Sequence, residues 1–265
     1  MAILTCTCFS TTLKQDVTFN AVVPTPEGNE QVTDQQTKSR ADGDGFPVIY
    51  LLHGAYGSYA SWGRFSNIER YAQQYGVVLI MASAENSFYQ DMAHGNPYFT
   101  FFTEELPTLV KHLFPVTHKR EKTYVAGFSM GGYGAWFLAL SRPDLYGKAA
   151  AMSGALDIVA TYEQGKQGII DSPFPWENVF ADPEHLAGSK ADLFALYETD
   201  RAKGCVPALY HACGRSDFLY GMNKAVHERL VSMGADVPFV EGEGGHEWDY
   251  WDRTIREILP WLCED

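Results

Sequence analysis

The sequence lacks any apolar run long enough to cross a membrane, and its basic residues are few. A membrane-spanning helix needs roughly 20 consecutive apolar residues, so we expect no membrane partner. Lys and Arg number 20 against 33 Asp and Glu, which gives a formal net charge of -13. Nucleic-acid binding depends on basic side chains that neutralise phosphates. The charge therefore argues against nucleic acid as a partner and disfavours strongly anionic substrates.

Cysteine is also scarce, with five residues scattered over the chain. An odd, dispersed set is typical of a reducing compartment rather than of a disulfide framework. The first residues contain neither a basic segment nor a long apolar core, so we expect no secretory signal and a cytoplasmic protein. Cys6 and Cys8 have the spacing of half a metal site, but no second Cys or His pair with suitable spacing accompanies them. The sequence therefore predicts no metal site.

What is present is the composition of one globular α/β domain over residues 1–265. The hydrophobic fraction of 46% and the charged fraction of 20% are those of a soluble globular protein, and the length suffices for one large core. Apolar strand-like runs alternate with segments of helical period, which predicts a mostly parallel central sheet with helices on both faces. Residues 3–9 and 16–23 are expected to form strands, and the alternation in the second favours an antiparallel pair at one edge.

Other segments predict the connections of this sheet. The polar segment 24–45 is interpreted as a loop. Helical patterns cover residues 66–75 and 98–114, and Pro107 should interrupt the second of these helices. Residues 156–205 break the alternation of strands and helices. We expect them to form a small cap of short helices over the mouth of the active site, and the alternative is a helical excursion away from it.

The most informative pattern is Gly-Phe-Ser-Met-Gly at residues 127–131, between an apolar run and a helical pattern. A serine on so sharp a strand-to-helix turn adopts strained backbone geometry, and a Cβ at either flanking glycine would collide with the neighbouring strand or helix. The N-H of Met130 would then face the place where an oxyanion develops. By itself the pattern is weak evidence, because such pentapeptides also occur in ordinary loops.

An acid and a histidine follow this pattern in the order that a hydrolase with a nucleophile elbow requires. Strand-like runs at 207–213 and 237–240 end shortly before Asp217 and His246, respectively. Because the carboxyl ends of parallel strands meet at one edge of a sheet, we expect Ser129, Asp217 and His246 to lie together there. The three side chains are the components of a catalytic triad.

A further pattern lies upstream, where the apolar run 47–52 enters the turn His-Gly-Ala-Tyr-Gly at 53–57. In this class of hydrolase the loop after the third strand supplies a second oxyanion-hole donor, and glycines let that backbone approach the substrate. We assign this donor to the N-H of Ala55, beside that of Met130. His53 is interpreted as a structural residue of the turn rather than a catalytic one.

With these residues placed, the chain resembles the α/β-hydrolase superfamily over nearly its whole length, and within it the esterase D-like group. It looks closest to the tributyrin-esterase and acetyl-esterase branch. The resemblance is carried by LLHG at 51–54, Trp62, SNIER at 66–70, SFYQDM at 87–92, GFSMGGYGA at 127–135 and SG at 153–154. It implies Ser129 as nucleophile, with Asp217 and His246 as its partners. It also implies the N-H groups of Ala55 and Met130 as oxyanion hole.

The function implied by this resemblance is that of a serine carboxylesterase acting on short acyl esters, from acetyl to butyryl. Candidate substrates are small-molecule or carbohydrate esters, including acetylated or feruloylated plant sugars. The mechanism requires no cofactor or metal. The sequence leaves open whether the protein forms a homo-oligomer. The alternative is an S-formylglutathione hydrolase, which the turn at 54–57 disfavours because those enzymes typically have Gly-Leu-Thr-Cys there. A peptidase of this fold usually has a second domain, and a non-catalytic binding protein usually lacks a triad member.

Aromatic residues near the predicted strand ends are candidates to line an acyl or alcohol pocket. They are Trp62, Phe88, Tyr89, Trp176, Phe218 and Trp248. About half of them are expected to serve packing instead. With the modest insertion, they predict a small apolar acyl pocket rather than a long lipid tunnel.

Overall fold

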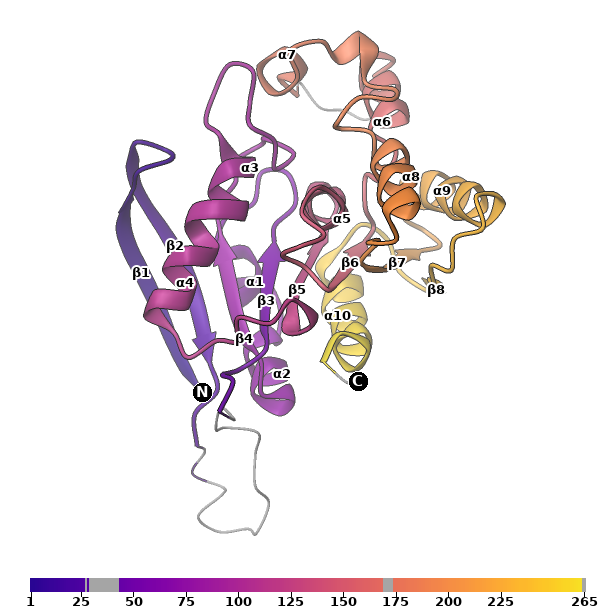
Figure 1. Cartoon of the computed structure of the whole chain (residues 1–265). Coiled ribbons are helices and arrows are strands. Elements are labelled where there is room, and N and C mark those ends of the chain that lie inside the picture. The colour runs from indigo at the N-terminus through magenta and orange to yellow at the C-terminus, as the bar shows by residue number, and fades with distance from the viewer. Residues whose placement is uncertain (27, 29–42, 169–173, 264–265) are drawn as a thin grey trace.

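An eight-stranded sheet forms the centre of the computed structural model, which describes residues 1–26, 28, 43–168 and 174–263 (Figure 1). Its strands, in chain order, are β1 (Ala2–Ser10), β2 (Gln15–Val23), β3 (Val48–Leu52), β4 (Val78–Ala82), β5 (Thr123–Phe128), β6 (Lys148–Met152), β7 (Ala208–Gly214) and β8 (Phe239–Gly242). The spatial order is β1-β2-β4-β3-β5-β6-β7-β8. Strands β3 to β8 pair in parallel, and β2 pairs antiparallel with β1 and β4. The expected mostly parallel sheet with an antiparallel edge pair is thus confirmed, whereas the predicted loop at 24–45 lies largely outside the described residues.

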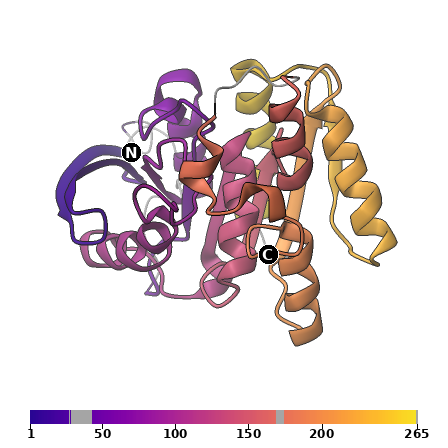
Figure 2. The same ribbon diagram turned by 90° about the horizontal axis from the view of Figure 1, so that it is seen from above.

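Helices cover both faces of this sheet (Figure 2). They are α1 (Ser61–Phe65), α2 (Ile68–Tyr75), α3 (Tyr98–Thr100), α4 (Leu106–Leu113), α5 (Met130–Ser141), α6 (Ile158–Lys166), α7 (Trp176–Val179), α8 (Leu193–Lys203), α9 (Tyr220–Ser232) and α10 (Trp248–Cys263), with short 3-10 turns at Arg120–Lys122 and Pro183–His185. No helix in the described part of the chain is long and apolar enough to cross a bilayer.

Alternation along the buried strands divides the core into two layers. In β3, Tyr50 and Leu52 belong to the hydrophobic cluster shared with α4, α5, α8 and α9. Ile49 and Leu51 belong to the cluster on the other face, shared with α1, α2 and α10. Both faces of this strand are buried, which is why its sequence is a continuous apolar run. The chain is therefore a single α/β domain of three layers.

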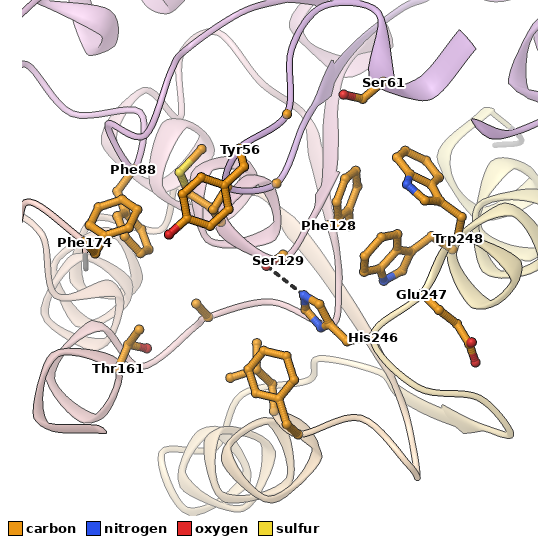
Figure 3. Close-up of a pocket in the computed structure, with 18 of the residues that line it drawn as sticks. Tyr56, Ser61, Phe88, Phe128, Ser129, Thr161, Phe174, His246, Glu247 and Trp248 are labelled. Atoms are coloured by element: carbon orange, nitrogen blue, oxygen red, sulfur yellow. Dashed lines mark hydrogen bonds between the residues drawn. The ribbon is translucent and has the colours of Figure 1, made fainter. Parts of the chain in front are cut away.

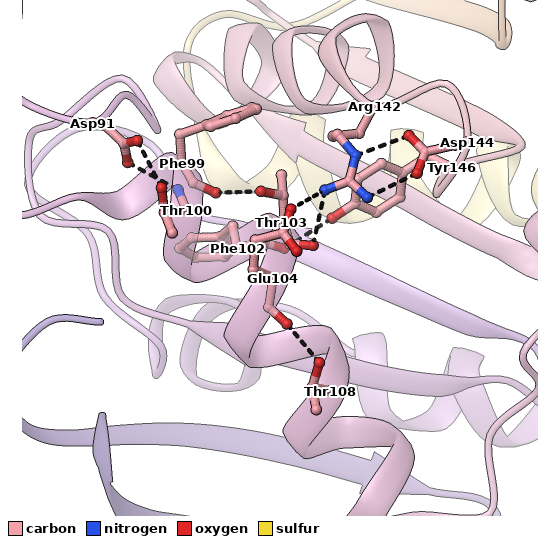
Figure 4. A network of polar contacts seen from close by, with 10 residues as sticks. All are labelled: Asp91, Phe99, Thr100, Phe102, Thr103, Glu104, Thr108, Arg142, Asp144 and Tyr146. Carbon is pink, nitrogen blue, oxygen red and sulfur yellow. Dashed lines mark hydrogen bonds and ion pairs between the residues drawn. The ribbon is translucent and has the colours of Figure 1, made fainter. Parts of the chain in front are cut away.

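The helical segment 98–114 is interrupted just before Pro107, as expected. The interruption takes the form of a π-helical turn at Phe101–Glu105, between α3 and α4. Pro107 has no N-H to donate to the carbonyl of Thr103 four residues earlier. The guanidinium of Arg142 donates to this carbonyl instead, at 3.4 Å, and is itself paired with Asp144 at 2.8 Å (Figure 4). A side chain from outside the helix thus donates to the carbonyl that cannot accept a hydrogen bond from the proline.

The insertion at 156–205 divides into two parts with different surroundings. Helices α6 and α7 lie beyond the carboxyl ends of the strands, whereas α8 lies beside α5 (Figure 1). Only the first part is near the edge of the sheet where the expected site residues meet. Helices α6 and α7 thus lie on the side where a cap is expected, and α8 lies where the alternative, an excursion away from the site, would place it. That the first part caps the active site stays a prediction.

Candidate active site

Ser129 lies on a sharp turn between the end of β5 and the start of α5. Its backbone is left-handed, with φ 56° and ψ -123°, a conformation that a non-glycine residue holds only when its surroundings impose it. A Cβ on Gly127 would lie 2.4 Å from the carbonyl oxygen of Gly131, and a Cβ on Gly131 would lie 2.5 Å from that of His53. Strand and helix therefore approach so closely that only glycine fits on either side of the serine.

The structure brings Ser129, His246 and Asp217 together from the loops after β5, β8 and β7. The Nε2 atom of His246 lies 3.0 Å from Oγ of Ser129 (Figure 3). Its Nδ1 atom lies 3.1 Å and 3.0 Å from the two carboxylate oxygens of Asp217. The Asp217 side chain is fully buried, and Oδ1 also accepts the N-H of Leu219 at 2.8 Å. This arrangement can move a proton away from the serine hydroxyl and stabilise the imidazolium that results.

The turn after β3 approaches Ser129 from the other side. A Cβ on Gly54 would lie 2.5 Å from the ring of Phe128 and 3.2 Å from Cβ of Ser129, so glycine permits this approach. His53 holds the turn: its Nε2 accepts the N-H of Ala84 at 2.9 Å, and its Nδ1 lies 2.7 Å from the carbonyl of Gly54. Burial lowers the pKa of His53 to about 4, so the ring is neutral at pH 7. His53 is a structural residue, as interpreted.

The two predicted oxyanion-hole donors both lie at the cavity beside Ser129. The N-H of Ala55 donates to no acceptor among the described residues. The N-H of Met130 is in the first turn of α5, where no intrahelical acceptor exists. Two residues whose backbone N-H groups have no acceptor among the described residues therefore border the same cavity, beside the positive end of the α5 dipole.

A cavity of about 620 Å³ opens beside these groups (Figure 3). Its lining includes the turn after β3, the loop after β4, the first part of the insertion and the start of α10, and nine of its 21 described residues are Phe, Tyr or Trp. Glu247 is the only Asp, Glu, Lys or Arg among the described lining residues. The described residues contain no cluster of three or more His, Cys, Asp or Glu side chains able to hold a metal ion. The site therefore suits an apolar or neutral ligand.

Four of the six aromatic candidates line this cavity, namely Phe88, Trp176, Phe218 and Trp248. Trp62 and Tyr89 do not, which corrects the expectation. Trp62 is 1% exposed and donates its indole N-H to the carbonyl of Leu52 at 2.9 Å. Tyr89 is 0% exposed and donates its hydroxyl to the carbonyl of His53 at 2.9 Å. Both rings support the backbone on which the site rests rather than the cavity itself.

Sequence reasoning missed Trp251, which lines the cavity and contacts the ring of His246. Its ring lies 5.0 Å from that of His246 at 90°, and it stacks on Phe128 at 4.1 Å. Its indole N-H donates to Oγ of Ser153 at 3.1 Å. Phe218 contacts the imidazole as well, at 4.5 Å. Trp251 has helical spacing with Ile255, Ile258 and Leu262, a pattern that indicates a core position and carries no signal of this contact.

The sequence relatives identify the family. Residues 35–262 match the family named Esterase. The chain belongs to the esterase family. An acetyl esterase of Caldicellulosiruptor saccharolyticus is 34% identical to this esterase over 268 residues, which cover 100% of this chain and 99% of that protein.

Solved structures similar to this esterase agree with that assignment. The fluorophosphonate-binding serine hydrolase F of Staphylococcus aureus has a TM-score of 0.85 and 26% identity, with 100% of this chain and 99% of that chain covered. An S-formylglutathione hydrolase of the same organism has a TM-score of 0.82 and 26% identity, with 99% of both chains covered. The protein is a serine esterase with the α/β-hydrolase fold.

Proposed function

We propose that this esterase hydrolyses short-chain acyl esters, from acetyl to butyryl, with Ser129, His246 and Asp217 as catalytic triad. The observation that carries the proposal is the unbroken chain of short contacts from the buried carboxylate through the imidazole to Oγ of Ser129. This chain ends at a cavity that is also lined by Ala55 and Met130, the residues of the two proposed oxyanion-hole donors. These are the parts that acyl transfer through a serine requires.

In the first half of the reaction, Nε2 of His246 takes the proton of Ser129 as Oγ attacks the ester carbonyl carbon. Asp217 keeps Nδ1 protonated and stabilises the imidazolium. The N-H groups of Ala55 and Met130 donate to the tetrahedral oxyanion. The imidazolium then gives its proton to the alcohol oxygen, the carbon-oxygen bond breaks, and the acyl group stays on Ser129.

In the second half, a water molecule replaces the departed alcohol. His246 takes one proton of this water as its oxygen attacks the acyl carbon, and returns the proton to Oγ of Ser129 when the acid leaves. Each proton removed is returned within the cycle. This chemistry needs no cofactor or metal.

The character of the cavity supports a neutral substrate. Its described lining contains no Lys or Arg, and Glu247 adds negative charge at the rim. Glutathione carries carboxylates at both ends, which would find no cationic partner there, although the solved S-formylglutathione hydrolase shares the fold. The sequence relative that is an acetyl esterase supports a short acyl group. Acetylated or feruloylated carbohydrates are neutral esters of the proposed class.

The first part of the insertion is proposed to act as a cap on the substrate. Thr161 and Gly165 of α6 line the cavity, as do Phe174 and Trp176 at the start of α7. A wall built from an insertion excludes water from the acyl group during the reaction. The α8 part, packed beside α5, has no place in this function.

The direct test is Ser129→Ala, because the nucleophile has no substitute in the proposed mechanism. The variant is expected to lose labelling by a fluorophosphonate and nearly all hydrolysis of p-nitrophenyl acetate. Ser141→Ala, at the C-terminal end of the helix α5 that follows Ser129, is the matched control. It should keep both the labelling and the hydrolysis. Labelling that persists in Ser129→Ala would overturn the proposed nucleophile.

The substrate range is tested with p-nitrophenyl esters from acetate to octanoate. A methylene that is buried contributes about 0.8 kcal/mol, and one that does not fit adds packing strain. We expect kcat/KM to peak between acetate and butyrate and to fall by octanoate, with S-formylglutathione a poorer substrate than p-nitrophenyl acetate. A series that rises through octanoate, or one led by S-formylglutathione, would contradict the proposed range.

A further inference from the structure

The cavity has an enclosed side and an open side, which lie on opposite sides of Ser129. Figure 3 shows Phe88 and Phe174 on one side of the serine, with His246 and Trp248 toward the other. The enclosed side is completed by Trp176, which is 9% exposed. On the other side the rings reach solvent. The two substituents of an ester would therefore meet different surroundings.

The position of His246 decides which substituent faces which side. Its Nε2 lies 3.0 Å from Oγ of Ser129 and must also reach the alcohol oxygen, because the same proton passes from one to the other. The alcohol oxygen therefore lies on the His246 side of the tetrahedral carbon. The acyl substituent must point away from the imidazole. The ring contacts of His246 are with Phe218 and Trp251, and not with the enclosed side.

We propose that the acyl group occupies the enclosed side, and that the alcohol leaves across the open side. The acyl side is formed by Phe88, Gly165 and Trp176 with Phe174, and the open side by Phe65 and Trp248 with Glu247. This assignment rests on the proposed triad and adds the residues that determine specificity. It predicts strict selection of the acyl group and broad acceptance of large neutral alcohols.

Close packing limits the length of the acyl group. Phe88 has a left-handed backbone, with φ 50°, and its ring lies 5.0 Å from that of Phe174 and 5.4 Å from that of Trp176. A Cβ added at Gly165 would lie 3.2 Å from the indole nitrogen of Trp176. The helix thus approaches the indole at a residue without a side chain. Any larger residue at 165 would extend into the space that the acyl chain needs.

The open side has the opposite character. Phe65 is 52% exposed, and its ring lies 5.3 Å from that of Trp248 at an angle of 33°. Phe218, at the cavity rim, is 61% exposed. Exposed rings of this kind offer a surface on which a flat or bulky neutral group can rest while its far end stays in water. The alcohol is therefore not limited in size by an enclosing wall.

Two variants, one on each side of the cavity, test this assignment. Gly165→Leu fills the acyl side and places a good helix former inside α6, so the helix is retained. Gln164→Leu adds the same side chain one position away, at a residue outside the cavity lining, and is its matched control. Phe65→Ala removes the exposed ring of the open side. Acyl selection is read from p-nitrophenyl butyrate against acetate, and alcohol selection from 2-naphthyl against phenyl acetate.

We expect Gly165→Leu to lower the butyrate-to-acetate ratio of kcat/KM by about tenfold, as a misfitting methylene does in an apolar pocket. The naphthyl-to-phenyl ratio should stay within about twofold of wild type. Phe65→Ala should leave the butyrate-to-acetate ratio unchanged and lower the naphthyl-to-phenyl ratio by about threefold or more, because it removes one aromatic contact. Gln164→Leu should change neither ratio. If Gly165→Leu changes only the alcohol ratio, or neither variant changes its ratio, the assignment is overturned.

Deacylation gives an independent reading, because the alcohol has left before this step. The breakdown of the butyryl-enzyme after the p-nitrophenol burst should change in Gly165→Leu and stay unchanged in Phe65→Ala. A change in Phe65→Ala alone would place the acyl group on the open side. Fluorophosphonate labelling of each variant counts the active sites. Loss of labelling only in Ser129→Ala, with unexpected ratios in the others, would refute the side assignment while leaving the proposed function standing.

Discussion

The carboxyl edge of the sheet and the hairpin of β1 and β2 both contain strained backbone, but they are held in different ways. The described residues with positive φ, glycine excepted, are Lys14, Tyr56, Glu85, Phe88, Tyr89, Ser129 and Ser153. All except Lys14 lie in loops after parallel strands, at the edge that carries the site. There the strain is held by close packing, because glycines let neighbouring segments approach within distances that no Cβ would permit.

The hairpin is held by one carboxylate instead. Glu105, from the π-helical turn, accepts hydrogen bonds from Ser10 Oγ at 2.6 Å, from the N-H and Oγ1 of Thr11 at 2.7 and 2.9 Å, and from the N-H of Thr12 at 3.0 Å. Partial burial raises the pKa of Glu105, but these hydrogen bonds outweigh it and lower the pKa to about 2. The comparison teaches that the site edge should respond to changes of volume, and the hairpin to changes of charge.

The largest effect is expected where the site edge also depends on a charge. Asp217→Asn keeps the shape of the buried side chain but favours the wrong tautomer of His246, and we expect kcat to fall by about 10⁴. Steady-state kinetics with p-nitrophenyl acetate measure the loss, and circular dichroism checks the fold. Asp249→Asn, an exposed residue of the first turn of α10, is the control and should keep its activity. If kcat falls as far in Asp249→Asn as in Asp217→Asn, Asp217 is not the acid of the triad.

A change of volume at the site edge should be next in size. In Gly131→Ala the added Cβ would meet the carbonyl oxygens of His53 and Leu52 at 2.5 Å and 2.7 Å. Backbone must move to relieve this, and we expect the free energy of unfolding to fall by about 3 kcal/mol. Gly221→Ala, in α9 with no atom within 4 Å of the added Cβ, should be neutral or slightly stabilising. Urea unfolding measures the stability of both variants. Equal free energies of unfolding for Gly131→Ala and Gly221→Ala would contradict the expected sensitivity of the site edge to volume.

Protonation of His53 should weaken the same edge on acidification. Burial lowers its pKa from 6.5 to about 4, so below pH 6.5 the unfolded chain binds a proton that the folded chain does not. Stability from this group is complete above pH 6.5 and falls as the pH drops toward 4, by about 2 kcal/mol between pH 7 and pH 5. The stability difference between wild type and His53→Asn should therefore shrink from pH 7 to pH 5. A constant difference would show that His53 is not the titrating group.

The smallest effect belongs to the hairpin. Glu105→Gln removes a charge that accepts several hydrogen bonds, and after discounting for solvent exposure we expect a loss of about 1 kcal/mol at pH 7. Because the folded pKa is lowered from 4.5 to about 2, this contribution is complete above pH 4.5 and disappears as the pH falls toward 2. Thermal unfolding at pH 7 and pH 3.5 measures it against Glu228→Gln on α9. If the stability difference between wild type and Glu105→Gln is the same at both pH values, the charge of Glu105 is not its cause.

The sequence by itself determined the elements whose signals are local. The turn at Ser129 is defined by its two glycines, and the loops that hold Asp217 and His246 follow apolar runs that must be buried strands. Parallel strands place their carboxyl ends at one edge, so the meeting of these three residues followed from the pattern alone. The antiparallel edge pair followed likewise from alternating apolar residues.

Only the tertiary structure decided where the rings beside those strand ends point. Phe88 and Tyr89 are adjacent and both left-handed, yet one lines the cavity and the other donates to the carbonyl of His53. Trp251 supports the imidazole through contacts with residues far away in the sequence. Gly165 matters because α6 lies against Trp176. The direction of a loop side chain is set by the packing of distant segments, and sequence periodicity carries no information about those contacts.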